Sequence, residues 1–156
     1  MILDEVKKYP ELSEILIDRD KLLRSLGIDM VTREYIVLAE LTIPELQDLQ
    51  IKSLMWSETV NEALSTAELL RDKQAGETER IASEVIKNMM SMETEYKVTE
   101  AKAHAKASPK VIEASNKLST LVAYCKFLDR LRETIDKYHY TVKGRTRKMD
   151  EIERKY

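Results

Sequence analysis

Few side chains in this 156-residue sequence have the types and spacing that catalysis or metal binding requires. Glu100 and His104 stand four residues apart, so on a helix they share a face that could contribute to a metal site. Further ligands would have to come from another helix, and no matching pair recurs in the sequence. An exposed helical histidine beside a glutamate is the favoured interpretation, and no metal is predicted.

The tripeptide Glu100-Ala101-Lys102 matches the short Glu-x-Lys motif of many nucleases. That motif normally needs a strand and an aspartate upstream, whereas this copy lies in an alanine-rich, helix-forming stretch. Three-residue matches arise often by chance. Nuclease activity is therefore kept only as the third hypothesis for this chain.

Cys125 is the one cysteine of the sequence, so no intrachain disulfide can form. It stands between Leu121 and Leu128 at helical spacing, which predicts a buried and unreactive thiol. The known glycine-rich phosphate-binding motifs are absent from the sequence. These observations predict a protein that is not an enzyme and has no catalytic residues and no cofactor.

The elements that position these side chains are predicted to be helices, because helix-forming residues dominate and only three Gly and three Pro are present. We expect an all-α fold of long antiparallel helices with a heptad-like C-terminal helix. An irregular segment of short helices is expected over 1–43 and a charged tail over 145–156. Between them, the main helical domain over 44–144 is expected to hold helices at about 44–72, 77–107 and 108–143.

Local signals set these boundaries. Pro44 and the pair Ser108-Pro109 mark helix starts, because proline is favoured in the first turn and serine before it. The polar stretch 72–76 is the predicted break, and Asp20 is expected to cap a turn that ends at Gly27. The β-prone run 35–38 is too short to distinguish a strand from a buried helix.

The C-terminal helix carries an apolar seam whose residues recur every three and four positions. A charged chain of this length buries little surface by itself, so we expect this seam to assemble a homo-oligomer. The predicted oligomer interface comprises Leu118, Leu121, Cys125, Leu128 and Ile135.

Charge is divided unevenly along the chain. Residues 1–96 hold 11 basic and 20 acidic side chains, whereas residues 97–156 hold 15 basic and 8 acidic ones. A basic half attracts polyanions, and aromatic rings beside it can stack on unpaired bases. The residues predicted to bind DNA are Lys126, Arg130, Lys137, Tyr138, Tyr140, Lys143, Arg145, Arg147 and Lys148.

The same charge division supports an alternative hypothesis. A scaffold or adaptor protein would use its acidic and basic halves for head-to-tail contacts with neighbouring subunits or with a partner. The sequence does not decide between these functions from charge alone.

The C-terminal pattern resembles that of the UvsY family of phage recombination mediators. The resemblance lies in the segment 109–113, Pro-Lys-Val-Ile-Glu, followed by Leu118, Phe127, Ile135 and Val142-Lys143. A second similarity is the stretch 17–22, Ile-Asp-Arg-Asp-Lys-Leu, near the start. Together they cover about a third of the chain.

This resemblance implies a helical homo-oligomer that binds single-stranded DNA. Such a protein helps a RecA-like recombinase displace single-strand-binding protein and form its filament. Members of the family carry a Lys-x-Arg-Leu-like DNA-contact motif, and the nearest stretch here, Leu70-Arg71-Asp72-Lys73, has the wrong order. DNA contacts are therefore expected on the C-terminal helix, with the surroundings of Arg71 and Lys73 as the alternative location.

The sequence begins with Met-Ile-Leu-Asp-Glu-Val, which lacks the basic and apolar regions of a signal peptide, and no apolar run approaches the length of a membrane span. We expect a cytoplasmic protein without membrane contact, located in the host cytoplasm if it is phage-encoded.

Overall fold

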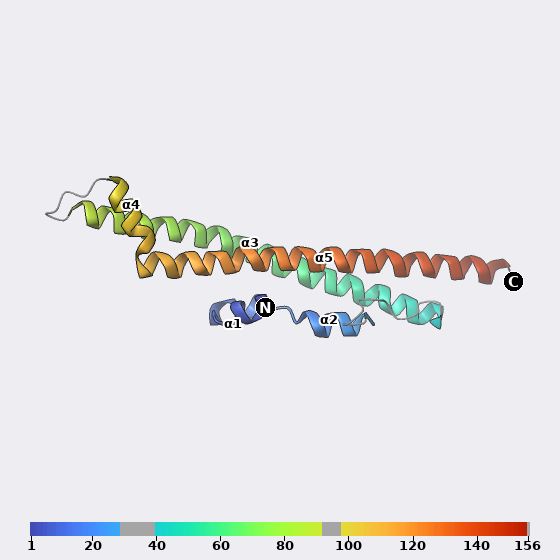
Figure 1. Ribbon diagram of the computed structural model, residues 1–156. Helices are drawn as coiled ribbons and strands as arrows, with labels where there is room; N and C mark the ends of the chain where they lie inside the picture. The colour runs from blue at the N-terminus through green and yellow to red at the C-terminus, as the bar shows by residue number, and fades with distance from the viewer. Residues whose placement is uncertain (29–39, 92–97, 156) are drawn as a thin grey trace. The chain divides into compact units, whose positions relative to one another are not determined.

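The computed structural model of the chain describes residues 1–28, 40–91 and 98–155. Its elements are α1 (Ile2–Lys7), the 3-10 helix η1 (Pro10–Ile15), α2 (Arg19–Ser25), α3 (Ile43–Met90), α4 (Val98–Ala107) and α5 (Pro109–Lys155). The two long helices, α3 and α5, pack together in antiparallel orientation (Figure 1). The predicted all-α fold with long antiparallel helices is confirmed.

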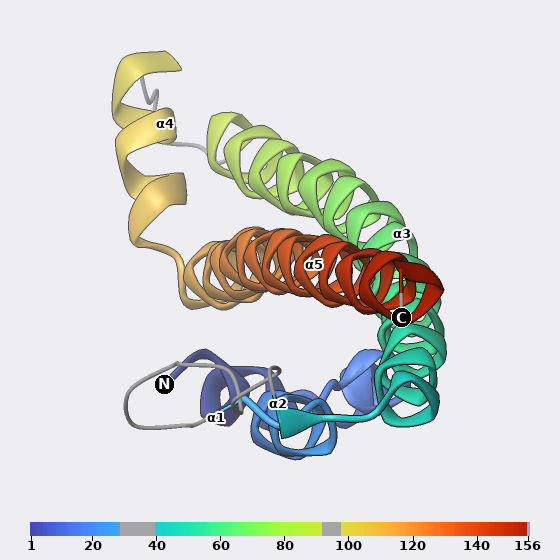
Figure 2. The same ribbon diagram turned by 90° about the vertical axis from the view of Figure 1, so that its right-hand side faces the viewer.

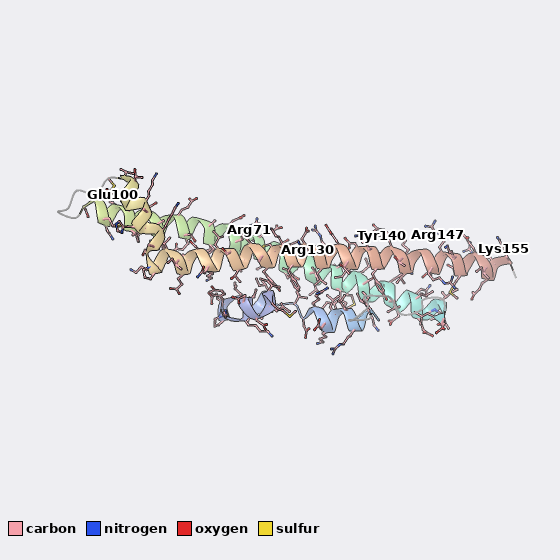
Figure 3. The ribbon with its side chains drawn as sticks, in the orientation of Figure 1. Arg71, Glu100, Arg130, Tyr140, Arg147 and Lys155 are labelled. Atoms are coloured by element: carbon pink, nitrogen blue, oxygen red, sulfur yellow. The ribbon has the colours of Figure 1, made fainter. Side chains whose placement is uncertain are left out.

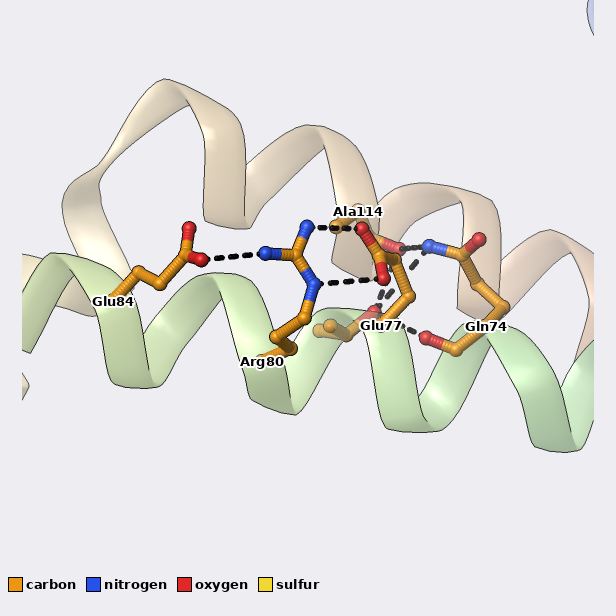
Figure 4. Close-up of polar contacts among 6 residues, drawn as sticks. Gln74, Glu77, Arg80, Glu84 and Ala114 are labelled. Carbon is orange, nitrogen blue, oxygen red and sulfur yellow. Dashed lines mark hydrogen bonds and ion pairs between the residues drawn. The ribbon is translucent and has the colours of Figure 1, made fainter.

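Helix α3 is continuous, and the expected break at 72–76 was wrong. Gly76 costs a helix interior about 1 kcal/mol relative to alanine, but contacts on both sides of it favour the helix. The Gln74 amide and the Thr78 hydroxyl, two residues before and after Gly76, both donate to the Ala114 carbonyl of α5, at 3.2 and 3.3 Å. The Arg80 guanidinium bridges Glu77 at 2.5 Å, one turn before it, and Glu84 at 2.6 Å, one turn after it (Figure 4). The predicted helix 77–107 is correspondingly divided, since its first part belongs to α3 and residues 98–107 form α4.

Capping explains the starts of the helices. Before α3, the Thr42 hydroxyl accepts a hydrogen bond from the Glu45 backbone N–H at 3.4 Å and donates to the Glu45 carboxylate at 3.0 Å, so Thr42 is the N-cap of the helix. Helix α5 begins at Pro109 as predicted.

Helix α2 is capped by Asp18 rather than Asp20, because the Asp18 carboxylate accepts the Lys21 N–H at 3.1 Å. Its end is as expected: Gly27 follows it with a φ of 72°, which side chains larger than glycine rarely adopt.

The charged C-terminal stretch was expected to be frayed or weakly helical from residue 145, and it is helical through Lys155 as the continuation of α5. Thr146 holds this part of α5 in place: it is buried, and its hydroxyl accepts a hydrogen bond from the Gln50 side chain of α3 at 2.7 Å. The β-prone run 35–38 lies outside the described residues.

The chain divides into two compact units, and α3 and α5 each contribute one part to both. The first unit comprises residues 1–13 and 65–126. Its core is built largely from small and aliphatic side chains, because Ala67 on α3 and Ala101 and Ala105 on α4 are all buried. Alanines at these positions allow helix backbones to approach closely.

The N-terminal segment of the first unit is tied to α5 by polar contacts. Lys117 forms an ion pair with Glu11, and its ammonium lies 5.7 Å from the centre of the Tyr9 ring. The Gln74 side-chain amide on α3 donates to the Ala114 carbonyl on α5 at 3.2 Å (Figure 4).

The second unit comprises residues 14–64 and 127–156, and it brings together α2, the start of α3 and the end of α5 (Figure 2). Its apolar core includes Leu22, Leu26, Leu46, Val60, Leu128, Ile135 and Val142, each less than 1% exposed. The Trp56 indole N–H donates to the Ser25 hydroxyl at 2.8 Å, which joins α3 to α2. Across the described residues, no helix has a stretch both apolar and long enough to span a bilayer.

Candidate nucleic-acid interface

Helix α5 has a buried apolar face and an exposed charged face. The predicted seam is buried: Leu121, Cys125, Leu128 and Ile135 are between 0% and 5% exposed, and Leu118 is half-buried. The surfaces that cover these residues belong to the same chain. The prediction that they form an oligomer interface is therefore not supported, because their periodicity reflects the intramolecular packing of α5.

The opposite face of α5 in the second unit carries most of the predicted DNA-binding residues. Six of them are exposed to solvent there: Arg130, Lys137, Tyr140, Lys143, Arg147 and Lys148. Steps of three, four and seven residues keep the first five on one side of the helix, and Lys148, next to Arg147, falls in line with Arg130. Figure 3 labels Arg130, Tyr140, Arg147 and Lys155 in order along α5. Lys126 is exposed as well, at the end of the α5 segment that belongs to the first unit.

These cations have no carboxylate partners among the residues that the structure describes. Ion pairs occupy Arg80, Lys117 and Arg132 elsewhere in the chain. In the C-terminal row, by contrast, no ion pair involves Arg130, Lys137, Lys143, Arg147 or Lys148. None of these five cations is therefore held in an ion pair there, and all five are exposed to an external anion.

Tyr140 is the one aromatic side chain in this row. It is 70% exposed, and its ring meets the His139 imidazole edge-on, with 5.8 Å between centroids and 69° between planes. His139 in turn is held by a contact to Ser53 on α3, so one side of the Tyr140 ring has a fixed neighbour. The rest of the ring is accessible for stacking.

Two predicted DNA contacts do not belong to this surface. Tyr138 is 1% exposed, and its hydroxyl donates to the Leu26 carbonyl, so it packs α5 against α2 and cannot stack on a base. Arg145 is half-buried, and its Nε is buried without a hydrogen-bond partner in the described chain. Helical spacing explains both, because 138 and 145 fall on the buried side of α5 beside Val142.

The structure adds a pair that the sequence did not indicate, Ser53 and His139. Their Oγ and Nδ1 atoms lie 2.8 Å apart, a contact that a serine nucleophile and its base would also make. Ser53 is 0% exposed, however, so no substrate can reach its hydroxyl in this structure. No signal in the sequence could link residues 86 positions apart without knowledge of the α3–α5 register.

The alternative DNA location around Arg71 is less suited to phosphates. The Arg71 Nε lies 3.2 Å from the Asp72 carboxylate, and this hydrogen bond raises the pKa of the guanidinium further. Lys73 is exposed two residues further on, about half a turn around the helix from Arg71. A cation whose charge is already matched by its neighbour contributes less to polyanion binding.

The candidate metal and nuclease residues, Glu100, Lys102 and His104, are exposed on α4. Within the described ranges, no three side chains of the ligating types converge into a metal site. Burial raises the pKa of the Cys125 thiol, as expected for an unreactive cysteine of the core.

Comparison with known proteins finds no family model, no curated protein and no solved structure that matches this chain.

Proposed function

We propose that this protein binds single-stranded DNA without catalysis, through the exposed row of cations on α5. The observation that carries the proposal is the concentration of five exposed cations without ion pairs, Arg130, Lys137, Lys143, Arg147 and Lys148, along one side of a single helix in the described chain. Lysine and arginine side chains bind phosphates and release condensed counterions. The resulting affinity for DNA depends little on the nucleotide sequence.

Tyr140 favours single strands over duplexes. Base stacking on an exposed ring needs an unpaired base, and each such contact stabilises a complex by about 1–3 kcal/mol. From Arg130 to Lys148 the helix rises about 27 Å, so several nucleotides can lie along one copy of the row. No base-reading groove is needed for this mode of binding.

The cellular role that fits best is that of a recombination mediator. By its resemblance to the UvsY family, the protein would hold single-stranded DNA, displace single-strand-binding protein and help load a RecA-like recombinase. The acidic first part of the chain fits this role. An acidic surface repels DNA, so those residues stay accessible to protein partners.

The first test is fluorescence anisotropy with labelled single-stranded and duplex DNA between about 50 and 200 mM salt. The proposal expects tighter binding to the single strand and a steep decrease in affinity with salt. Replacing Lys137, Lys143, Arg147 and Lys148 by Ala is expected to reduce the salt slope by about 3, since each phosphate contact on a single strand contributes about 0.7.

The matched control removes the same charge elsewhere. Lys7, Lys21, Lys87 and Lys106 are also exposed, have no ion pair among the described residues and lie outside both candidate DNA sites, so their replacement by Ala tests net charge alone. Equal losses in the two variants would mean that the α5 row is not the binding surface.

A scaffold or adaptor function is the second candidate. It is favoured by one observation, the exposed aliphatic side chains Ile51, Leu54 and Met55 on α3, which are suited to a protein contact. Under this function alone, the anisotropy of the labelled single strand would stay constant at low salt while the protein self-associates.

A further inference from the structure

Helix α3 has an exposed apolar patch with an acidic margin. Ile51, Leu54 and Met55 are 59%, 53% and 63% exposed, and their spacing of three and four residues puts them on one face. Glu58 and Glu62 continue this face by one and two turns, are exposed and form no ion pair among the described residues. We call the five residues the acidic-apolar face.

The same unit carries a complementary surface on α5. There an exposed aromatic residue, Tyr140, is followed by Lys143 and Arg147 at three and seven residues. On α3, Met55 is followed by Glu58 and Glu62 at the same two intervals. In both helices the rise is about 4.5 Å to the first charge and about 10.5 Å to the second.

We propose that a second copy of this chain docks its α5 onto the acidic-apolar face of α3. In a parallel alignment of the two helices, Tyr140 packs on Ile51 and Met55, Lys143 pairs with Glu58, and Arg147 pairs with Glu62. An antiparallel alignment would place Tyr140 against Ser65 instead, because the order of apolar and charged positions would be reversed.

The charge pattern favours α5 of a second copy of this chain over an uncharged partner. A purely apolar partner would leave both glutamates next to its surface without compensation, whereas α5 supplies one cation for each. Exposed ion pairs contribute little energy by themselves, so the aromatic and aliphatic contact provides most of the affinity and the charges fix the register. A modest, salt-sensitive self-association follows.

This docking also has a consequence for DNA, which rests on the proposed function. Tyr140, Lys143 and Arg147 are among the residues proposed to hold the single strand. A second copy that covers them excludes DNA from the same side chains. Single-stranded DNA and self-association therefore compete, and the self-associated protein is a form that binds DNA weakly.

Charge exchange tests the docking. Sedimentation velocity of the full chain at low salt should show Glu58→Lys/Glu62→Lys and Lys143→Glu/Arg147→Glu each self-associating at least about tenfold more weakly than the parent chain. An equimolar mixture of the two variants should recover the association, because each altered face meets a complementary one. The control Glu68→Lys/Glu79→Lys changes the same charge at exposed positions elsewhere on α3 and should associate as the parent chain does.

Two results would overturn the docking: a parent chain that stays monomeric at low salt, or a mixture that associates no better than the separate variants. Circular dichroism of each variant checks that helix content is retained, so that loss of association is not loss of fold.

Adding an unlabelled oligothymidine to the self-associated parent chain separates this inference from the proposed function. Dissociation of the assembly supports the competition, and a complex that keeps both the assembly and the DNA refutes it. If charge exchange succeeds but the oligothymidine neither binds nor dissociates the protein, the docking stands and the DNA-binding function fails.

Discussion

The Ser53 hydroxyl of α3 lies 2.8 Å from the His139 Nδ1 of α5 and 2.8 Å from the Gln50 carbonyl. The hydroxyl has one proton, and when Ser53 donates it to the carbonyl, the His139 Nδ1–H donates to the Ser53 oxygen. This contact fixes the register of the two helices from within the core of the second unit.

Ser53→Ala is expected to lower the free energy of unfolding by about 1–2 kcal/mol, because a half-buried imidazole N–H loses its acceptor. Urea denaturation measures the change. Ser83→Ala on the exposed side of the same helix is the control, and it should change stability by no more than about 0.5 kcal/mol. Equal effects at both positions would indicate that the Ser53 contact contributes nothing specific.

The two tyrosines of α5 are expected to separate stability from binding. Tyr138→Phe removes the hydrogen bond to the Leu26 carbonyl and should cost about 1 kcal/mol of stability while leaving DNA affinity unchanged. Tyr140→Ala removes a 70% exposed ring, so it should leave stability nearly unchanged and weaken single-strand binding by about 1–3 kcal/mol. Thermal melts and anisotropy are recorded for both variants. A loss of DNA affinity in Tyr138→Phe, or a loss of stability in Tyr140→Ala, would contradict this assignment.

Gly76→Ala is expected to stabilise the protein by about 1 kcal/mol. A Cβ added at this position meets no heavy atom within 4 Å, so the gain in helix propensity carries no steric cost. Chemical denaturation of both proteins, fitted with one common dependence of the unfolding free energy on denaturant concentration, measures the difference in stability. A destabilised variant would show that Gly76 serves a bend or close contact after all.

The Glu11 carboxylate supplies a pH-dependent contact in the first unit. Its hydrogen bond with Lys117 holds the pKa of Glu11 below its ordinary value. The unfolded chain therefore binds the proton at higher pH than the folded chain does. The stabilisation is complete above the ordinary glutamate pKa and is lost as the pH falls through the lowered value.

Carbon-detected NMR titration of the Glu11 carboxyl measures this directly. Lys117→Ala should return its pKa towards the ordinary value, whereas Lys110→Ala, on the same helix without an ion pair to Glu11, should leave it low. Because the Glu11 carboxylate is 52% exposed, the accompanying change in stability is expected to be small.

Much of the fold follows from sequence periodicity, and the errors have a common cause. The pair Ser108-Pro109 correctly predicted where α5 begins. Spacing of three and four residues correctly predicted an apolar face that carries Leu121, Leu128 and Ile135, all of which are buried. Periodicity indicates that a face is covered but not what covers it. The seam was therefore assigned to a second copy, although α3 and the N-terminal segments of the same chain cover it.

The remaining errors concern residues whose environment depends on contacts between helices that are distant in sequence. The hydrogen bonds that Gln74 and Thr78 donate to the Ala114 carbonyl of α5 support a continuous α3 through Gly76, although the composition of 72–76 is typical of a turn. Tyr138 and Tyr140 are nearly adjacent, and only their angular positions on α5 distinguish a core residue from a surface one. Applied consistently, the same helical spacing would have excluded Tyr138 and Arg145 from the binding surface.

Lys143 and Arg147 stand one turn apart on α5, and neither forms an ion pair among the described residues. Like charges at this spacing repel each other, so the helix around them is slightly destabilised when no anion is bound. Dissolved salt screens that repulsion, but it also weakens binding to phosphates. Ionic strength therefore acts with opposite sign on the stability of this part of α5 and on its affinity for DNA.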